Sequence, residues 1–394
     1  MKPRVLIFTS YYLPGYRAGG PIKSVAAAVE ALHDKYQIAI VTRDREVGER
    51  RPYEVARNGQ TARYGGVPVH YVPPNARCIL HIRDLVRRYD PDLIYLNSLF
   101  DPVVTTVPLL LRRCGLVARD IGVALAPRGE FSQGALSLKR LRKRAFLTFA
   151  KGIDLYRGVI WQATAEKEVP EIRGAIAPTA PVIVVVPDPP ATPQLGASNT
   201  RPAKSLSALR LIFLGRISRM KNLDGALRIL RNVRQRVQFS IYGPTEDEDY
   251  WKQCQELIAQ LPDNVSVSYL GAVEPHQVSE AFFQNDLLFL PTLGENFGHV
   301  ICEAWACGCP VLISDRTPWR ELEGKGVGWD VPLNQPEVFA RIIDRCAQLD
   351  PSEFELLRRK AHTHAQELRT LGAASNSLNE LFSRALTHHA WAQC

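Results

Sequence analysis

The sequence predicts an α/β protein with two domains, each built on a mostly parallel sheet. Short apolar, β-branched runs alternate with helix-like stretches along most of the chain, which is typical of doubly wound α/β domains. The chain has 394 residues, enough for two domains that each bury a core. A segment rich in Pro, Ser and Gly, residues 188–208, interrupts the alternation and predicts a linker.

The first domain is expected to begin with a buried strand at residues 4–9. A loop containing Gly19, Gly20 and Pro21 leads into an Ala-rich helix at residues 24–33. Paired glycines let backbone approach a ligand closely, although the loop also fits a plain strand-to-helix turn. It lacks the spaced glycines of a dinucleotide fold, so we predict no NAD site. Further strands are predicted at residues 37–42, 67–72, 93–96, 121–126, 158–162 and 182–186.

The second half repeats the same alternation, and the tail from residue 351 is largely helical in composition. Two similar halves joined by a linker predict an interdomain cleft, where small-molecule sites are favoured. Strands are predicted at residues 210–214, 238–242, 265–270, 286–290 and 310–314, and helices at residues 223–233, 250–261 and 277–284.

Composition narrows the class of protein. A formal net charge of +9 favours anionic partners such as a nucleotide or an anionic membrane surface. No zinc-finger, RNP or basic-zipper pattern occurs, so no nucleic-acid partner is predicted. There is no long uncharged apolar run and no signal-peptide pattern at the start, so we expect a cytoplasmic protein. The scattered cysteines fit reduced, buried thiols better than disulfides or a zinc site.

Residues 139–151 concentrate six basic residues among Leu and Phe side chains. A basic amphipathic helix with aromatic residues can lie on an anionic membrane surface. The pattern also fits an ordinary helix with one solvated face. Peripheral membrane contact is therefore one of two predictions for this segment.

Cationic side chains follow predicted strands, where ligands of parallel sheets bind. Arg128 follows strand 121–126 and could meet a phosphate or a leaving group, or could be a solvated surface residue. Arg216 and Lys221 follow the first strand of the second domain, after Gly215. Two fixed cations there can neutralise a diphosphate and stabilise charge that develops on it.

Residues 294–311, with the apolar run 287–290 before them, predict a strand, loop, helix and strand in series. Glu295 lies at the end of the predicted loop and Glu303, eight positions later, inside the predicted helix. At a helical rise this spacing is roughly 12 Å, whereas a glycosidase carboxyl pair needs about 5–9.5 Å. The two carboxylates therefore suit the ends of one extended ligand, although a capped helix with one exposed Glu is the alternative. Backbone amides at the helix start can bind an anion between them. These amides belong to Asn296, Phe297, Gly298 and His299.

The series of motifs closely resembles the group 1 glycosyltransferases, glycosyltransferase family 4. The resemblance covers nearly the whole chain. In the second domain it rests on Gly215-Arg216 with Lys221, on Tyr242-Gly243, on Glu295-Asn296-Phe297-Gly298 with Glu303, and on Gly308 with Pro310-Val311. In the first domain it rests on Gly19-Gly20-Pro21, Pro127-Arg128-Gly129 and Thr164-Ala165-Glu166.

The resemblance implies a GT-B fold, with two Rossmann-like domains that face a cleft. The donor would bind the C-terminal domain and the acceptor mainly the N-terminal one, and the last helix would cross back. The expected divisions are residues 1–187, 188–208 as linker, 209–370, and 371–394 as the returning helix.

The resemblance also assigns roles, and the catalytic residues that it implies are Glu295, Arg216, Lys221 and Arg128. Arg216 and Lys221 would grip the donor diphosphate, Glu303 the ribose hydroxyls and Glu295 the sugar hydroxyls. Many relatives have a histidine where this chain has Arg128, and arginine cannot act as a base at neutral pH. Arg128 would bind acceptor or sugar instead. The other donor-binding residues implied are Gly19, Gly20, Gly215, Gly243, Pro244, Asn296, Phe297, Gly298, His299 and Val300.

The predicted activity is retaining, metal-independent transfer of a sugar from a nucleotide sugar to a glycan or lipid-linked acceptor, in cell-surface polysaccharide biosynthesis. No cofactor or metal is expected, and the acidic residues 246–249 are predicted to be a solvated turn. The alternatives are a nucleotide-sugar epimerase of the same fold and a non-catalytic nucleotide-sugar-binding protein. The cytoplasmic location would include the inner face of the membrane if residues 139–151 bind it.

Overall fold

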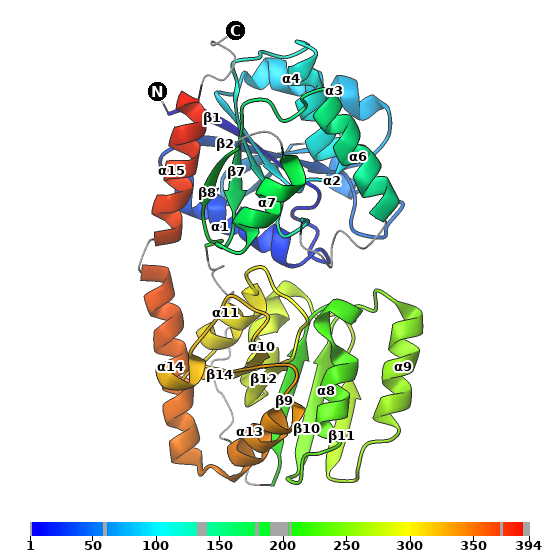
Figure 1. Ribbon diagram of the computed structural model, residues 1–394, viewed down its shortest axis with the longest axis vertical. Coiled ribbons are helices and arrows are strands. Elements are labelled where there is room, and N and C mark those ends of the chain that lie inside the picture. Colours follow the sequence, from blue (N-terminus) through cyan, green and yellow to red (C-terminus); the bar gives the residue numbers. More distant parts are fainter. Residues whose placement is uncertain are drawn as a thin grey trace. The chain divides into compact units, whose positions relative to one another are not determined.

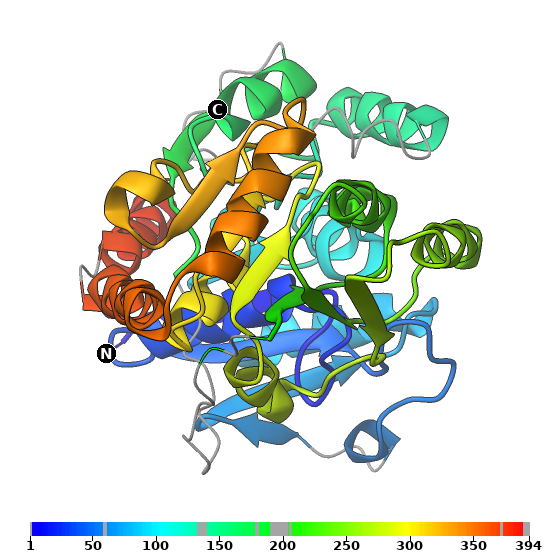
Figure 2. The ribbon, with the colours of Figure 1, turned by 90° about the horizontal axis from the view of Figure 1, so that it is seen from below.

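The computed structural model divides into two compact units, Met1–Pro189 with Gly372–Cys394, and Pro190–Leu371 (Figure 1). It describes residues 2–57, 61–131, 140–177, 181–189, 204, 207–370 and 373–388. Most of the predicted linker and the 371–372 junction lie outside these residues. Each unit has a sheet of predominantly parallel strands with helices on both faces (Figures 1 and 2). The predicted fold class, two doubly wound α/β domains, is confirmed.

The first unit contains an eight-stranded sheet with the order β3-β4-β2-β1-β5-β6-β7-β8. Neighbouring strands are parallel except for β3 and β4. Side chains of β1 alternate between two cores: Leu6 and Phe8 pack on one face, and Val5 and Ile7 on the other. The strands are β1 (Arg4–Thr9), β2 (Gln37–Arg43), β3 (Ala62–Tyr64), β4 (Val67–Val72), β5 (Leu93–Asn97), β6 (Gly122–Ala126), β7 (Val159–Ala163) and β8 (Val182–Val185).

Helices of this unit cover the two faces of its sheet. They are α1 (Gly20–Leu32), α2 (Glu54–Arg57), α3 (Arg77–Tyr89), η1 (Pro102–Thr106), α4 (Val107–Arg113), α6 (Arg140–Gly152), α7 (Glu168–Ile176) and α15 (Ala373–Thr387). Helix α1 begins a turn earlier than predicted, because Gly19 adopts a left-handed φ of 66° and Pro21 suits the first turn. Helix α15 packs against α1, β6 and β7 through buried Leu378, Leu381 and Phe382. The end of the chain therefore completes the core of the first unit.

The second unit has a six-stranded, fully parallel sheet with the order β11-β10-β9-β12-β13-β14. Its strands are β9 (Leu209–Leu214), β10 (Val237–Tyr242), β11 (Val265–Tyr269), β12 (Leu287–Leu290), β13 (Val311–Ser314) and β14 (Gly328–Val331). Its helices are η2 (Arg219–Lys221), α8 (Leu223–Leu230), α9 (Glu248–Ile258), η3 (Pro275–Gln277), α10 (Val278–Phe283), α11 (His299–Ala306), α12 (Leu322–Lys325), α13 (Pro336–Gln348) and α14 (Pro351–Thr370). Among the helices that the structure describes, none has the length and apolar character needed to cross a bilayer.

A buried ion cluster fastens α14 to this sheet. Asp286, fully buried just before β12, accepts hydrogen bonds from Arg210 Nη2 at 2.8 Å and from Arg358 Nη2 at 2.5 Å. Helix α14 also supports α11, because His362 Nδ1 lies 2.8 Å from the Ala306 carbonyl and the His364 ring packs on Trp305. The position of α11 therefore depends on α14.

We predict that Asp286→Ala lowers the free energy of unfolding by about 3–5 kcal/mol, because it removes the carboxylate that faces the buried guanidinium of Arg358 and the partly buried guanidinium of Arg210. Urea denaturation would measure this loss. Glu323→Ala is the matched control, since Glu323 and Arg345 form a pair that is mostly exposed. Its effect should stay within about 0.5 kcal/mol. Equal effects of the two substitutions would contradict the conclusion that Asp286 fastens α14 to the sheet.

Candidate functional site

The predicted donor residues of the second unit gather where its parallel strands end. Strands β10, β9 and β12 are neighbours, so the loops after Tyr242, Leu214 and Leu290 emerge side by side. Backbone hydrogen bonds join these loops: Ile217 N donates to Pro244 O at 2.9 Å, and Leu293 N donates to Met220 O at 2.9 Å. The three loops therefore form one continuous surface.

Gly215 and Gly243 make the closest approach between these loops. Gly243 has a φ of 143°, and a Cβ added to it would lie 1.8 Å from the carbonyl oxygen of Gly215. Such a contact is far inside van der Waals distance, so only glycine fits at position 243. The sequence predicted both glycines as donor-binding, and the structure shows a packing requirement that does not depend on a ligand.

Lys221 and Glu295, both predicted as catalytic, form an ion pair between Nζ and Oε1. The lysine ends η2, and the glutamate lies in the loop between β12 and α11. Their side chains are 18% and 11% exposed, so the pair is largely shielded from solvent. Thr292 Oγ1 donates to Met220 O at 2.9 Å and holds the two loops together beside the pair. The structure thus brings these two predicted residues into contact.

Arg216 is also paired. Its Nη1 lies 2.8 Å from Glu246 Oε1, and both side chains are about half exposed. Asp247 caps α9 by accepting from Tyr250 N at 2.9 Å, and its other carboxylate oxygen lies 3.5 Å from Arg219 Nε. Of residues 246–249, predicted to be a solvated turn, Glu246 is exposed as expected but is paired, whereas Glu248 and Asp249 already belong to α9. Local sequence does not predict these ion pairs, because the partners are about 30 residues apart.

Helix α11 begins at His299, with Gly298 as N-cap at a left-handed φ of 80°. Glu295 therefore lies outside the helix, and the predicted 12 Å separation, which assumed helical rise throughout, does not apply. Glu303 lies in the second turn and is 6% exposed. The side-chain amide nitrogen of Asn296 is buried and has no hydrogen-bond partner among the described residues. This donor could serve a ligand at the helix start.

The other predicted residues near α11 are held by packing. Phe297 is buried, its carbonyl accepts from Trp319 Nε1 at 2.6 Å, and its ring centroid lies 4.8 Å from that of His299. Val300 occupies the first turn and is partly buried.

Burial, with Glu303 beside it, raises the pKa of the Cys302 thiol, so this cysteine is a core residue and not a nucleophile. Burial likewise raises the pKa of Tyr242, which ends β10.

A metal site is not evident in the part of the chain that the structure describes. No group of three or more His, Cys, Asp or Glu residues there is arranged to hold a metal ion.

In the first unit, Arg128 follows β6 with a left-handed φ of 55°. One guanidinium nitrogen pairs with Asp188, and the other donates to Asn97 Oδ1 at 2.6 Å and to Tyr95 Oη at 3.1 Å. Asp188 also accepts from Ser24 Oγ at 2.7 Å and is 5% exposed. Asp188, predicted as the first linker residue, is therefore buried, and Arg128 is not a solvated surface arginine.

Two further polar clusters at this edge of the first unit were not predicted. Arg43 pairs with Asp101 at 2.6 Å, and Asp101 also accepts from Ser10 Oγ at 2.7 Å. Glu130 accepts from Ser98 Oγ at 2.9 Å and from the amides that follow, and burial raises the pKa of its carboxyl group. Only their place in the sequence could have indicated these clusters, since their residues lie at or just after the carboxyl ends of predicted strands or in the next loop.

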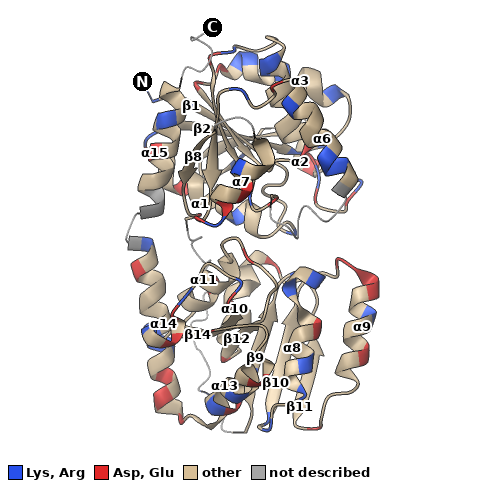
Figure 3. Ribbon diagram, viewed as in Figure 1, with Lys and Arg blue, Asp and Glu red and all other residues tan. Residues whose placement is uncertain are grey.

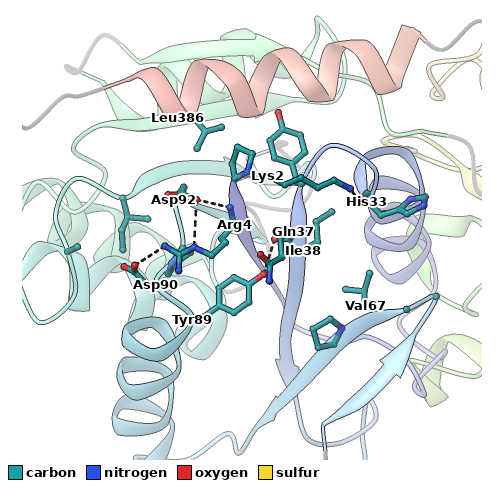
Figure 4. A pocket seen from close by; sticks show the side chains of 18 of the residues that line it. Lys2, Arg4, His33, Gln37, Ile38, Val67, Tyr89, Asp90, Asp92 and Leu386 are labelled. Atoms are coloured by element: carbon teal, nitrogen blue, oxygen red, sulfur yellow. Dashed lines mark hydrogen bonds and ion pairs between the residues drawn. The ribbon is translucent and has the colours of Figure 1, made fainter.

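The first unit also contains a cavity of about 1530 Å³ at the amino ends of its strands (Figure 4). Arg4 lies in it, with Nη2 2.7 Å from Asp90 Oδ2 and its backbone amide 2.7 Å from Asp92 Oδ2. None of the predicted site residues lines this cavity. Ligands of doubly wound sheets bind at the carboxyl ends of strands, so we do not assign the cavity to the site.

The chain is similar in sequence and in fold to known glycosyltransferases. Residues 201–363 match the family model described as glycosyl transferases group 1. The D-inositol 3-phosphate glycosyltransferase of Streptomyces griseus is 28% identical over 204 residues, which are 49% of this chain and 43% of that protein. The match thus spans less than half of the relative's length.

Two solved structures have the same fold over almost the whole chain. Sucrose-phosphate synthase from Thermosynechococcus elongatus superposes with a TM-score of 0.70 at 16% identity, covering 97% of this chain and 99% of that one. The HepE protein of Anabaena in complex with UDP-glucose gives 0.65 at 15% identity, with the same coverage. At such identities the likeness shows the fold alone. The second unit therefore resembles a group 1 glycosyl transferase domain over residues 201–363, and the chain has the GT-B fold, as the resemblance implied.

We predict that Gly243→Ala lowers the free energy of unfolding by about 2 kcal/mol or more, because the new methyl group meets backbone and the φ is unfavourable. Thermal or urea unfolding would measure the loss. Gly324→Ala in α12 is the control, since its Cβ would meet nothing within 4 Å. That change should be neutral or stabilise by about 0.5 kcal/mol. A neutral Gly243→Ala would show that the loops can separate freely.

Proposed function

We propose that this protein is a retaining glycosyltransferase of family 4 that moves a sugar from a nucleotide sugar to a glycan or lipid-linked acceptor. The observation that carries the proposal is the contact of Lys221 with Glu295 beside the start of α11. A cation for phosphate, a carboxylate for hydroxyls and exposed helix amides are the groups that such a donor needs. The family match of this unit, and the UDP-glucose bound by HepE, support it.

In this mechanism the donor diphosphate lies between Arg216, Lys221 and the amides of α11. The bond from the anomeric carbon to the diphosphate oxygen breaks, and its electron pair stays on the diphosphate. The acceptor hydroxyl oxygen bonds to the anomeric carbon from the same face, and its proton passes to the departing diphosphate oxygen. The two cations and the helix dipole stabilise that charge, so no metal is required. Glu303 accepts from ribose hydroxyls at the other end of the ligand.

Lys221 must change partners when the donor binds. Its ammonium group has three donors, so it can contact phosphate while it releases or shares Glu295. Glu295 is then able to accept from the sugar hydroxyls. Arg128 remains a permanent cation that binds acceptor or sugar, and it does not act as a base. Gly19 and Gly20 would let the start of α1 approach the substrate.

We predict that Lys221→Ala lowers kcat/KM for sugar transfer by about 100-fold, because a preorganised charge on the leaving group is lost. Glu303→Ala should weaken donor binding by about tenfold, the cost of one charged hydrogen bond. A panel of nucleotide sugars, screened by thermal shift and then by product analysis, would identify the donor and measure both effects.

Lys252→Ala is the control for this experiment, since Lys252 is an exposed residue of α9. Full activity in both Lys221→Ala and Glu303→Ala would contradict the site. Conversion of the donor without any acceptor would indicate an epimerase, and tight binding without turnover would indicate a binding protein.

We further propose that α6 places the protein on the anionic inner surface of the cell membrane, where lipid-linked acceptors of polysaccharide biosynthesis are presented. The side chains of Leu141 and Phe149 are 83% and 53% exposed, and Arg142 and Arg144 are exposed beside them. Apolar and cationic groups on one helix surface suit an anionic interface. Lys139, part of the predicted segment, lies outside the described residues.

We predict that the protein floats with vesicles containing phosphatidylglycerol but not with phosphatidylcholine alone. The double substitution Arg142→Glu with Arg144→Glu should reduce vesicle binding at least about tenfold, because each basic residue near the surface contributes about 1 kcal/mol. Arg87→Glu with Arg88→Glu, an equal charge change at exposed positions of α3, should have a much smaller effect. Absence of flotation at low salt would rule out this mode of membrane binding.

A further inference from the structure

The segment that leads into α9 is acidic and faces the basic loop after β9. Glu246 pairs with Arg216, and Asp247 lies near Arg219. Figure 3 shows acidic residues at the start of α9 and basic residues near the start of α8. The function proposed above assigns the basic loop to the donor diphosphate and gives the acidic segment no role.

Backbone contacts fix Glu246 in this place. Ile217 and Thr245 form an isolated parallel bridge, and Glu246 N donates to Ile217 O at 3.2 Å. The backbone of Glu246 is therefore hydrogen-bonded to Ile217, the residue that follows Arg216. These backbone bonds hold the two side chains of the ion pair next to each other.

Two of the ion pairs in these loops differ in exposure. Lys221 and Glu295 are largely shielded, whereas the side chains of Arg216 and Glu246 are 51% and 48% exposed. An exposed pair contributes little to stability and is easily replaced by another anion. A diphosphate offers several charged oxygens and bidentate contacts to a guanidinium, so it can displace one carboxylate.

We propose that Glu246 is an internal competitor for the donor diphosphate on Arg216. This inference rests on the function proposed above. In the empty site the carboxylate occupies the guanidinium, and the donor must displace it. After transfer, Glu246 re-forms the pair and speeds departure of the nucleoside diphosphate. Glu246 is thus a positioning residue that lowers affinity and shortens product residence, and it takes no part in bond breaking.

The test measures equilibrium binding of UDP and of GDP to the full chain by titration calorimetry. Glu246→Gln should bind the recognised nucleotide about two- to fivefold more tightly than the unchanged protein, because an exposed pair and a nearby like charge are both removed. Dissociation, followed by stopped flow, should slow by a similar factor. The gain should shrink as salt is raised, since the effect is electrostatic.

Two controls separate this role from a general charge effect. Glu256→Gln makes the same charge change at an exposed position of α9 and should leave affinity nearly unchanged. In an Arg216→Gln background, Glu246→Gln should give a much smaller gain, because the contested cation is absent. Glu246→Asp keeps the charge and should remain near the unchanged protein.

The outcomes distinguish this proposal from the proposed function. If the chain binds UDP or GDP, loses binding in Lys221→Ala, and shows no gain in Glu246→Gln, then Glu246 is not a competitor and the donor site stands. An equal gain in Glu256→Gln, or an undiminished gain without Arg216, would also overturn the inference. If neither nucleotide binds the unchanged protein, both proposals fail for these donors.

Discussion

The contact between Gly243 and the carbonyl of Gly215 governs the geometry at the carboxyl end of the second sheet. Because no side chain separates the two loops, Ile217 reaches the backbone of residues 244–246. These backbone hydrogen bonds place Glu246 against Arg216. A second set of hydrogen bonds, from Leu293 and Thr292 to Met220, places Glu295 near Lys221. The Arg216–Glu246 pair therefore depends on a backbone approach that only glycine permits.

Two of the ion pairs in the candidate site differ in how far they are exposed to solvent. The shielded pair, Lys221 with Glu295, keeps a cation in place without leaving a bare charge in a partly buried position. The exposed pair, Arg216 with Glu246, can exchange partners with little loss of stability. The basic residues of this surface are thus paired with carboxylates, Arg216 with Glu246 and Lys221 with Glu295. Charge in the sequence alone suggested a permanently basic loop.

Most of the strands could be predicted from the sequence, and so could the loops that carry the candidate site residues, but not how those residues pair. Strand β1 was predicted with its observed bounds because it is a nearly uniform apolar run, and β4 because its apolar residues alternate with Pro68 and His70. Strands β3 and β14 were missed, since each is very short and β14 contains Gly and Asp. Partners such as Arg128 and Asp188 are 60 residues apart and meet only through the order of strands, which local periodicity does not encode. Glu295 was predicted at the end of the loop and Glu303 inside the helix, as observed, whereas the spacing between them assumed a helical rise that begins only after the left-handed Gly298.

The packing of α15 has a consequence for how the chain is made. Leu378, Leu381 and Phe382 belong to the same core as Val5 and Ile7, although nearly the whole sequence separates them. During synthesis the second unit is a continuous segment and can fold as soon as it has emerged, whereas the face of the first sheet that α15 covers must wait until α15 has been made. Domains usually fold in the order of their synthesis, and an exposed apolar face is prone to aggregate. In this protein the first unit is completed only after the second unit has been made, so truncation before α15 would leave an apolar face of the first sheet exposed.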